Sequence, residues 1–242
     1  MMLTKFAFKV LVFLIITLLT SLAFCQFLKV GLLLGEPYAF WVSNKLSGIE
    51  FDLWHAIGDE LGLQVEFYVL PFAALDNAIL PKLGLDVVAG GIHMTEERKK
   101  TFKFTQPYIT SGLAIVVRSE IKWDGNVEKI TFGVKKGATG EKIVQEWIKS
   151  GKKVKYTSFV SNEEIVTNLL IKKIDGAFFD YINALYLSNK YGFHVHKDLI
   201  YTISVGAVIL NNSLEKRLNE AIAKLVTNGT VRRIVVSYVG SY

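Results

Sequence analysis

Hydrophobic and polar residues change their spacing repeatedly along this chain, and these changes predict strands that alternate with helices. Residues 28–34 form an apolar run that ends in a Gly-Glu-Pro turn, a pattern typical of a strand buried in a parallel sheet. Residues 51–61 carry large apolar side chains at helical spacing and stop at Gly62, which indicates a helix. An α/β protein is therefore expected.

The same reasoning extends the alternation to the end of the chain. Further strands are predicted at residues 65–70, 86–89, 113–118, 130–134, 154–156, 176–179 and 204–210. Further helices are predicted at residues 71–83, 95–98, 141–149, 162–172, 181–191, 213–226 (capped by Ser213) and 230–238. Open parallel sheets place ligand sites at the carboxyl ends of their strands. The loops after Leu34, Ala89, Val134 and Phe179 are therefore where chemistry is expected.

The first 25 residues have the features of an export signal. Lys5 and Lys9 form a basic start, and residues 10–19 are apolar apart from one threonine. Ala23 and Cys25 fit a cleavage site before Gln26, which predicts a periplasmic or extracellular protein. Two alternatives remain open: a lipoprotein signal with Cys25 acylated, which the bulky Phe24 disfavours, and a retained anchor, for which the apolar run is short.

Cysteine and charge usage narrow the function further. Cys25 is the only cysteine, so the mature domain has no disulfide and no cysteine-based metal cluster. His194 and His196 could share a strand face, but they lack neighbouring ligands, and no metal or cofactor is expected. The net charge of +6 falls to +4 without the two leader lysines. The basic residues are scattered without interleaved aromatics, which argues against nucleic-acid binding.

Short motifs in the predicted loops carry the strongest functional signal. They read GEPYAF at 35–40, SGIEFDL at 47–53, LDVVAGGIHMTEER at 85–98, FTQPY at 104–108, GAT at 137–139, IDGAFFD at 174–180 and NGT at 228–230. From about residue 28 to the end, the chain resembles bacterial extracellular solute-binding protein family 3, the polar amino-acid-binding proteins of ABC importers. The D-x(8)-T-x-x-R segment followed by F-T-x-P-Y is the most specific part.

The resemblance implies a two-lobed periplasmic-binding-protein-like (type II) fold, shared with ionotropic glutamate receptor ligand cores. Residues 27–111 plus 208–242 would form lobe one, and residues 117–200 lobe two. Residues 112–116 and 201–207 would be the two hinge strands, with the ligand held between the lobes.

The resemblance also implies which residues hold the ligand. An amino-acid zwitterion needs a partner for each charge, because an unpaired buried charge is very costly. Arg98 would bind the carboxylate with its planar fork, and Asp180 the ammonium. Backbone N–H groups near Gly91 and His93, and others near Ala138 and Thr139 at a helix N-terminus, would assist. Tyr38 and Phe72 would cover the ligand.

Simpler interpretations of these residues stay open. Arg98 could form a surface ion pair, Asp180 could cap the helix that starts at residue 181, and Phe72 could be a core aromatic. Two positions also depart from the family, because His93 and Ala138 stand where hydroxyl residues are usual. The leucines at 32–34 offer no acid for a basic ligand, which favours a neutral, apolar or aromatic amino acid.

The sequence therefore predicts an exported, monomeric amino-acid-binding protein that closes on its ligand and serves an ABC permease. A periplasmic cyclohexadienyl dehydratase, acting on prephenate or arogenate with His93 or Glu36 as general acid, would use the same fold. A ligand-sensing module is a third interpretation.

Overall fold

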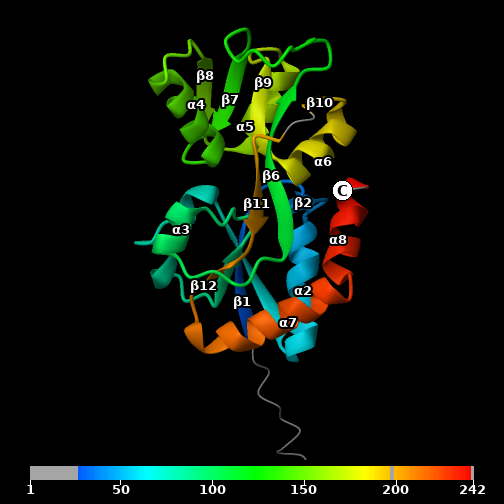
Figure 1. The fold of residues 1–242 in the computed structure, drawn as a ribbon. Coiled ribbons are helices and arrows are strands. Elements are labelled where there is room, and N and C mark those ends of the chain that lie inside the picture. Colours follow the sequence, from blue (N-terminus) through cyan, green and yellow to red (C-terminus); the bar gives the residue numbers. More distant parts are fainter. Residues whose placement is uncertain (1–26, 197–198, 241–242) are drawn as a thin grey trace, which may run out of the picture.

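The computed structural model describes residues 27–196 and 199–240. The predicted leader and Cys25 lie outside these residues. The described chain forms two α/β lobes, each built on its own sheet (Figure 1). This architecture confirms the predicted α/β fold class.

The first lobe contains a four-stranded sheet in the order β12-β5-β1-β4. Its strands are β1 (Phe27–Leu33), β4 (Gln64–Leu70), β5 (Val87–Ala89) and β12 (Val208–Ile209). β1 pairs in parallel with β4 and β5, whereas β12 is antiparallel to β5. The helices of this lobe are α2 (Ile49–Leu61), α3 (Glu96–Thr101), α7 (Glu215–Thr227) and α8 (Thr230–Val239). Fully buried Trp54 and Ile57 of α2 join alternate side chains of β1 in one core cluster.

The second lobe contains a mixed sheet in the order β10-β6-β9-β7-β8, with β11 also paired to β6. The strands are β6 (Ile109–Val117), β7 (Thr131–Lys135), β8 (Lys155–Phe159), β9 (Gly176–Asp180), β10 (His194–Val195) and β11 (Tyr201–Val205). The helices are α4 (Thr139–Lys149), α5 (Asn162–Leu170) and α6 (Tyr181–Tyr191). Ala114 and Val116 of β6 pack into one core cluster while Leu113 and Ile115 pack into another, as the alternation of a strand buried on both faces requires.

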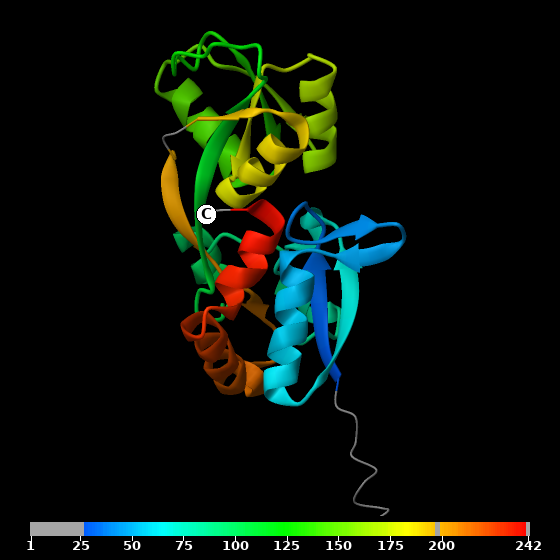
Figure 2. The same cartoon turned by 90° about the vertical axis from the view of Figure 1, so that its right-hand side faces the viewer.

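Two strands run between the lobes (Figure 1). The first half of β6 pairs with β11, from Ile109 opposite Val205 to Leu113 opposite Tyr201. From Leu113 onward, β6 pairs instead with β9 of the second sheet. A short hairpin of β2 (Phe40–Val42) and β3 (Lys45–Ser47) projects from the first lobe (Figure 2). The end of α8 lies beside α6, where Asn189 donates to the Val239 carbonyl at 3.3 Å.

The predicted helix at 71–83 is wrong. Only two 3-10 turns occur there, η1 (Phe72–Ala74) and η2 (Leu80–Lys82). Pro81 lacks the N–H that a continuous helix needs, and the Asp76 side chain accepts from the Ala78 N–H and so favours a turn. Ile79 and Leu83, whose spacing suggested the helix, are 43% and 38% exposed.

Two further boundaries differ from expectation. The strand predicted at 204–210 is interrupted: β11 ends at Val205 and β12 begins at Val208 in the other sheet, because the chain passes from one lobe to the other at Gly206. Ser213 does not cap α7. It lies in a 3-10 turn, η3 (Asn212–Leu214), where the Asn211 side chain accepts from the Ser213 N–H.

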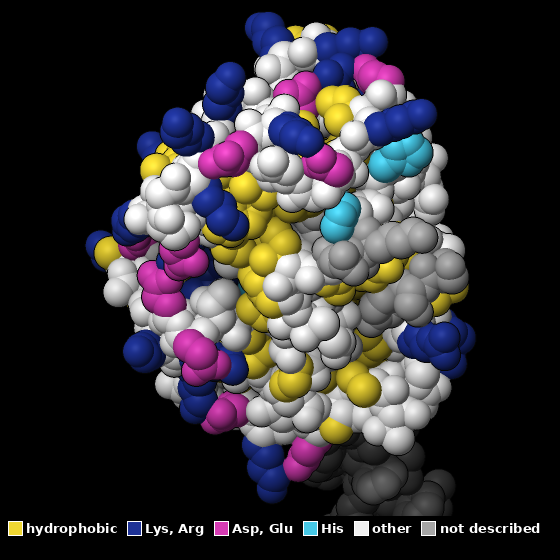
Figure 3. Space-filling view, turned by 45° about the horizontal axis from the view of Figure 1, so that its top comes forward, with side chains coloured by type: hydrophobic (Ala, Val, Ile, Leu, Met, Phe, Trp, Pro, Cys, Tyr) yellow, Lys and Arg dark blue, Asp and Glu magenta, His cyan; other side chains and the backbone are white. Residues whose placement is uncertain are grey.

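The surface shows no face of a single charge in the view of Figure 3, where Lys and Arg side chains are interspersed with Asp and Glu. Among the helices of residues 27–196 and 199–240, none combines the length and apolar character needed to cross a membrane.

Candidate ligand site between the lobes

A cavity lies where the two lobes meet, and residues of both lobes line it. From the first lobe come Leu34, Gly35, Glu36, Tyr38, Phe72, Gly90, Gly91, His93 and Arg98. From the second come Leu113, Lys135, Ala138, Thr139, Gly140, Asn162, Phe178, Phe179, Asp180 and Asn183. All eight residues predicted to bind the ligand are among them. The loops at the carboxyl ends of β1, β5, β7 and β9 meet here, as the rule for parallel strands requires.

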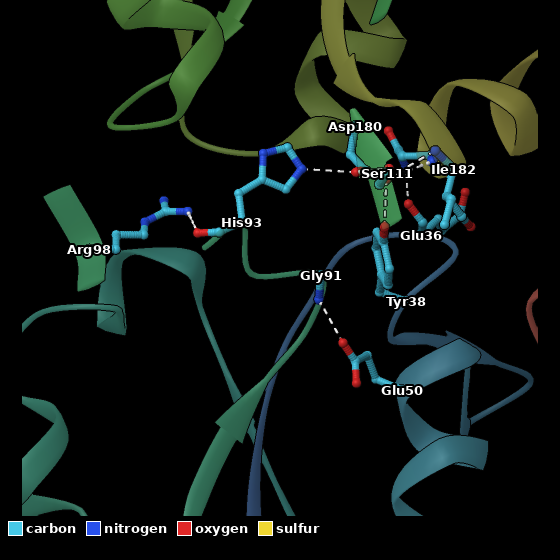
Figure 4. Close-up of polar contacts among 10 residues, drawn as sticks. Glu36, Tyr38, Glu50, Gly91, His93, Arg98, Ser111, Asp180 and Ile182 are labelled. Atoms are coloured by element: carbon cyan, nitrogen blue, oxygen red, sulfur yellow. Dashed lines mark hydrogen bonds and ion pairs between the residues drawn. The ribbon is translucent and has the colours of Figure 1, made fainter. Parts of the chain in front are cut away.

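Glu50 fixes the Gly90–Gly91 loop beneath the cavity. Its carboxylate is fully buried and accepts from the Gly91 N–H at 3.0 Å (Figure 4). The Gly90 N–H donates to the same carboxylate at 3.3 Å. It also accepts from the indole of Trp54 and the hydroxyl of Tyr108. Burial raises the pKa of Glu50, and these hydrogen bonds oppose the rise. The Gly91 N–H was predicted to donate to the ligand, but in the structure it already donates to Glu50.

The backbone conformation of this loop requires a glycine at position 91. Its φ of 68° lies in the left-handed region, and an added Cβ would approach the Tyr38 ring to 2.5 Å. The close contact lets Tyr38 lie against the loop with its hydroxyl directed at Asp180.

Asp180 joins the two lobes. One carboxylate oxygen accepts from the Tyr38 hydroxyl at 2.6 Å and from the N–H groups of Ile182 and Asn183, so Asp180 also caps α6. The other accepts from the Ser111 hydroxyl at 2.5 Å and lies 2.9 Å from His93 Nε2 (Figure 4). Burial by itself would raise the pKa of Asp180, but the bonds to His93, Ser111 and Tyr38 lower it below its ordinary value. The carboxylate is therefore held as an anion.

Changing Asp180 to asparagine separates these two roles. Asparagine caps helices as well as aspartate does, so α6 should keep its start. The variant loses the negative charge that is predicted to bind the ligand ammonium. We therefore expect the affinity for an amino acid to fall at least tenfold, which corresponds to about 1.4 kcal/mol. Titration calorimetry measures the affinity, and thermal unfolding checks the cap. An unchanged dissociation constant would show that Asp180 serves only the helix.

Arg98 lies on α3, whose first turn is capped by the Thr95 hydroxyl. One guanidinium nitrogen donates to the His93 carbonyl at 3.1 Å, and the group lies 5.8 Å from the Phe72 ring centroid. Among the described residues, no carboxylate lies within 4.0 Å of it. Its neighbour Glu97 pairs instead with Lys142. Burial lowers the pKa of Arg98, although the charges of Glu97 and Tyr201 oppose the shift.

Further direct contacts join the two lobes. Lys142 of α4 pairs with Glu97, and Lys190 of α6 pairs with Glu36 at 2.8 Å. The Asn183 amide nitrogen donates to the Glu36 carbonyl. With the bonds to Asp180, these contacts hold the lobes in a closed arrangement.

Several cavity residues were not predicted to bind the ligand, and two of them, Lys135 and Asn183, carry polar groups without a full partner. Lys135 ends β7, and its ammonium lies 3.7 Å from the Phe72 ring centroid. Asn183 is 2% exposed, and its Oδ1 has no hydrogen-bond partner within the structure described. Lys135 directly follows a predicted buried strand, which is a signal that could have been used. Asn183 lies inside a helix and carried no such signal.

Other sequence expectations have structural outcomes. The Ala138 N–H donates to the Lys135 carbonyl and is thus engaged in a turn, whereas Thr139 opens α4 at the cavity. His194 lies 3.0 Å from the Ser119 carbonyl, and His196 stacks edge-on with Trp123 at 5.0 Å. No cluster of potential metal ligands occurs in the described part of the chain.

Comparisons with known proteins agree with this geometry. The model for bacterial extracellular solute-binding proteins, family 3, matches residues 28–241. A putative amino-acid ABC transporter-binding protein, PatH of Vibrio harveyi, is 27% identical over 214 residues, covering 85% of each chain.

Solved structures show the same fold. An ancestral arginine-binding protein bound to arginine is 29% identical with a TM-score of 0.78, covering 89% of this chain and 99% of that one. The ligand-binding core of GluR0 with L-glutamate gives a TM-score of 0.76 at 20% identity, covering 89% of this chain and 99% of that one, which shows the fold alone.

These matches confirm the predicted two-lobed type II fold and the resemblance on which it was based. They also favour a binding protein over an enzyme, because the matched family is one of solute-binding proteins. The chain belongs to the bacterial extracellular solute-binding proteins, family 3.

Proposed function

We propose that this protein is exported, captures an α-amino acid between its lobes and delivers it to the permease of an ABC importer. One observation supports this most: the cavity places an arginine without a carboxylate partner on one lobe and an aspartate held as an anion on the other. An α-amino acid offers the complementary pair of charges. The name of the Vibrio harveyi relative points to the same class of ligand.

In this proposal the ligand carboxylate takes the free side of the Arg98 fork, which donates two parallel hydrogen bonds. The α4 N-terminus at Thr139 faces the same cavity and favours an anion. The ammonium donates to Asp180 and to the unpartnered Oδ1 of Asn183.

Asp180 already accepts five hydrogen bonds, so one donor has to withdraw when the ammonium arrives. The two backbone donors are fixed by α6. His93 and Tyr38 donate from the opposite lobe, so opening would free Asp180 for the ammonium, and one of these two side chains would stay displaced in the ligand-bound closed form. We propose that the lobes bend about hinge residues 112–116 and 201–207, and that the ligand shifts the population toward the closed form.

The proposal also covers where the protein is located and whether it assembles with other copies of itself. We propose that the leader directs export, that the mature chain is released by cleavage after Cys25 rather than anchored there, and that it acts as a monomer. Mass measurement of the secreted protein separates an unmodified mature chain from a lipidated one.

A thermal-shift screen of the mature protein against the common amino acids tests the central claim. A ligand that binds only the folded form stabilises it by about 4 kcal/mol at a thousand times its dissociation constant. We expect one amino acid, or a small related group, to raise the melting temperature by several degrees. If none does, and incubation with prephenate yields phenylpyruvate, the dehydratase interpretation would replace this proposal.

A further inference from the structure

Lys135 gives the cavity a second positive charge. Its ammonium lies over the Phe72 ring, 3.7 Å from the centroid, and the Arg98 guanidinium lies against the same ring at 5.8 Å. Lys135 comes from the second lobe, at the end of β7, and Arg98 from the first, on α3. Two cations from opposite lobes thus converge on one aromatic side chain inside the candidate site.

The acids that line the cavity are already engaged by other groups. Glu36 pairs with Lys190, and Asp180 is bonded to His93, Tyr38 and Ser111. Glu163 acts on Lys135 through its charge, but it lies outside the cavity lining. Within residues 27–196 and 199–240, no carboxylate lies within 4.0 Å of the Lys135 ammonium.

The surroundings of Lys135 therefore disfavour its charge. Burial, with a further contribution from the nearby Arg98, lowers the pKa of the lysine to about 8, although Glu163 opposes the shift. A negative group beside the ammonium would compensate for the lost hydration. A neutral ligand would leave the charge uncompensated, and a cationic side chain would be repelled by it.

The zwitterion of the proposed function accounts for only part of this charge. Its carboxylate satisfies Arg98, and its ammonium satisfies Asp180. The Lys135 ammonium then has no negative partner, and a second carboxylate on the ligand would supply one.

We propose that the cavity selects an acidic amino acid, whose side-chain carboxylate binds the Lys135 ammonium beside Phe72. This inference rests on the proposed function, because it assumes that Arg98 and Asp180 hold the α-carboxylate and the α-ammonium. It replaces the sequence-based expectation of a neutral, apolar or aromatic side chain.

The proposal has a pH signature. An acidic ligand binds the protonated form of Lys135, so its affinity should be nearly constant below about pH 8 and should fall as the pH rises through that value. Affinity for the corresponding amide, which has no charge to pair with Lys135, should change much less over the same range.

The test is calorimetry of the mature protein with glutamate, aspartate, glutamine and arginine. We expect glutamate or aspartate to bind at least tenfold more tightly than glutamine and arginine. Lys135→Met should remove this preference by weakening the acidic ligand at least tenfold while leaving glutamine unchanged. Lys136→Met is the matched control, because Lys136 is the exposed neighbour and does not line the cavity; it should retain the preference.

The outcomes separate this inference from the function on which it rests. Tighter binding of glutamine, arginine or another neutral or basic amino acid would overturn the acidic-ligand inference and leave the proposed function standing. An acidic preference that survives in Lys135→Met would also overturn it. Binding of glutarate with no binding of any amino acid would overturn both. Thermal unfolding of each variant checks that it is folded.

Discussion

Replacing Arg98 by alanine is expected to abolish detectable amino-acid binding. The guanidinium is the group without a carboxylate partner to which the ligand carboxylate is assigned, and the variant would leave that carboxylate buried and unpaired. Loss of one partner of a buried ion pair costs about 3–5 kcal/mol. That is a drop in affinity of at least a hundredfold. Calorimetry with the best ligand from the screen measures it.

The stability of the ligand-free variant provides the control. Arg98→Ala also loses the hydrogen bond from the guanidinium to the His93 carbonyl, so thermal unfolding of the empty variant checks that it is still folded. Arg98→Lys keeps the charge without the planar fork and should bind with intermediate affinity. Near-native affinity in Arg98→Ala would show that the carboxylate binds elsewhere.

Replacing Glu50 by leucine is expected to destabilise the first lobe by about 3–5 kcal/mol, because several buried donors lose their acceptor. The carboxylate is fully buried and receives four donors: two backbone N–H groups, an indole and a hydroxyl. Leucine accepts none of them, and each buried donor left without a partner costs about 1–3 kcal/mol. This loss is a large fraction of the stability of an ordinary domain. Denaturant-induced unfolding of the ligand-free protein measures it.

Glu50→Gln is the matched variant for this effect. Its amide oxygen can still accept from Gly90 and Gly91, while its NH2 group would face the indole donor of Trp54, so an intermediate loss is expected. If Glu50→Leu unfolds at the same denaturant concentration as the unchanged protein, the buried carboxylate does not support the loop. Surviving ligand affinity in Glu50→Gln would show that the loop keeps its position.

The sequence determined the alternation of strands and helices, because each element carries its own hydrophobic period. Helix α6 was predicted with its exact limits at 181 and 191, since Asp180 and Gly192 are local signals that begin and end a helix. The segment at 71–83 shows the limit of this reasoning. Its apolar spacing suggested a helix, but Pro81 and the Asp76 turn outweigh the spacing.

The sequence also identified residues that the fold brings to one cavity, because their motifs follow the carboxyl ends of strands. It did not reveal which of these residues contact one another. Asp180 meets Tyr38, Ser111 and His93 across as many as 142 positions, and local pattern carries no record of such a contact. The same holds for Lys135, which looks like any lysine that ends a strand. Its charge became informative only when the tertiary structure placed the half-buried side chain against Phe72 without a nearby carboxylate, since burial and partners set the energy of a charge.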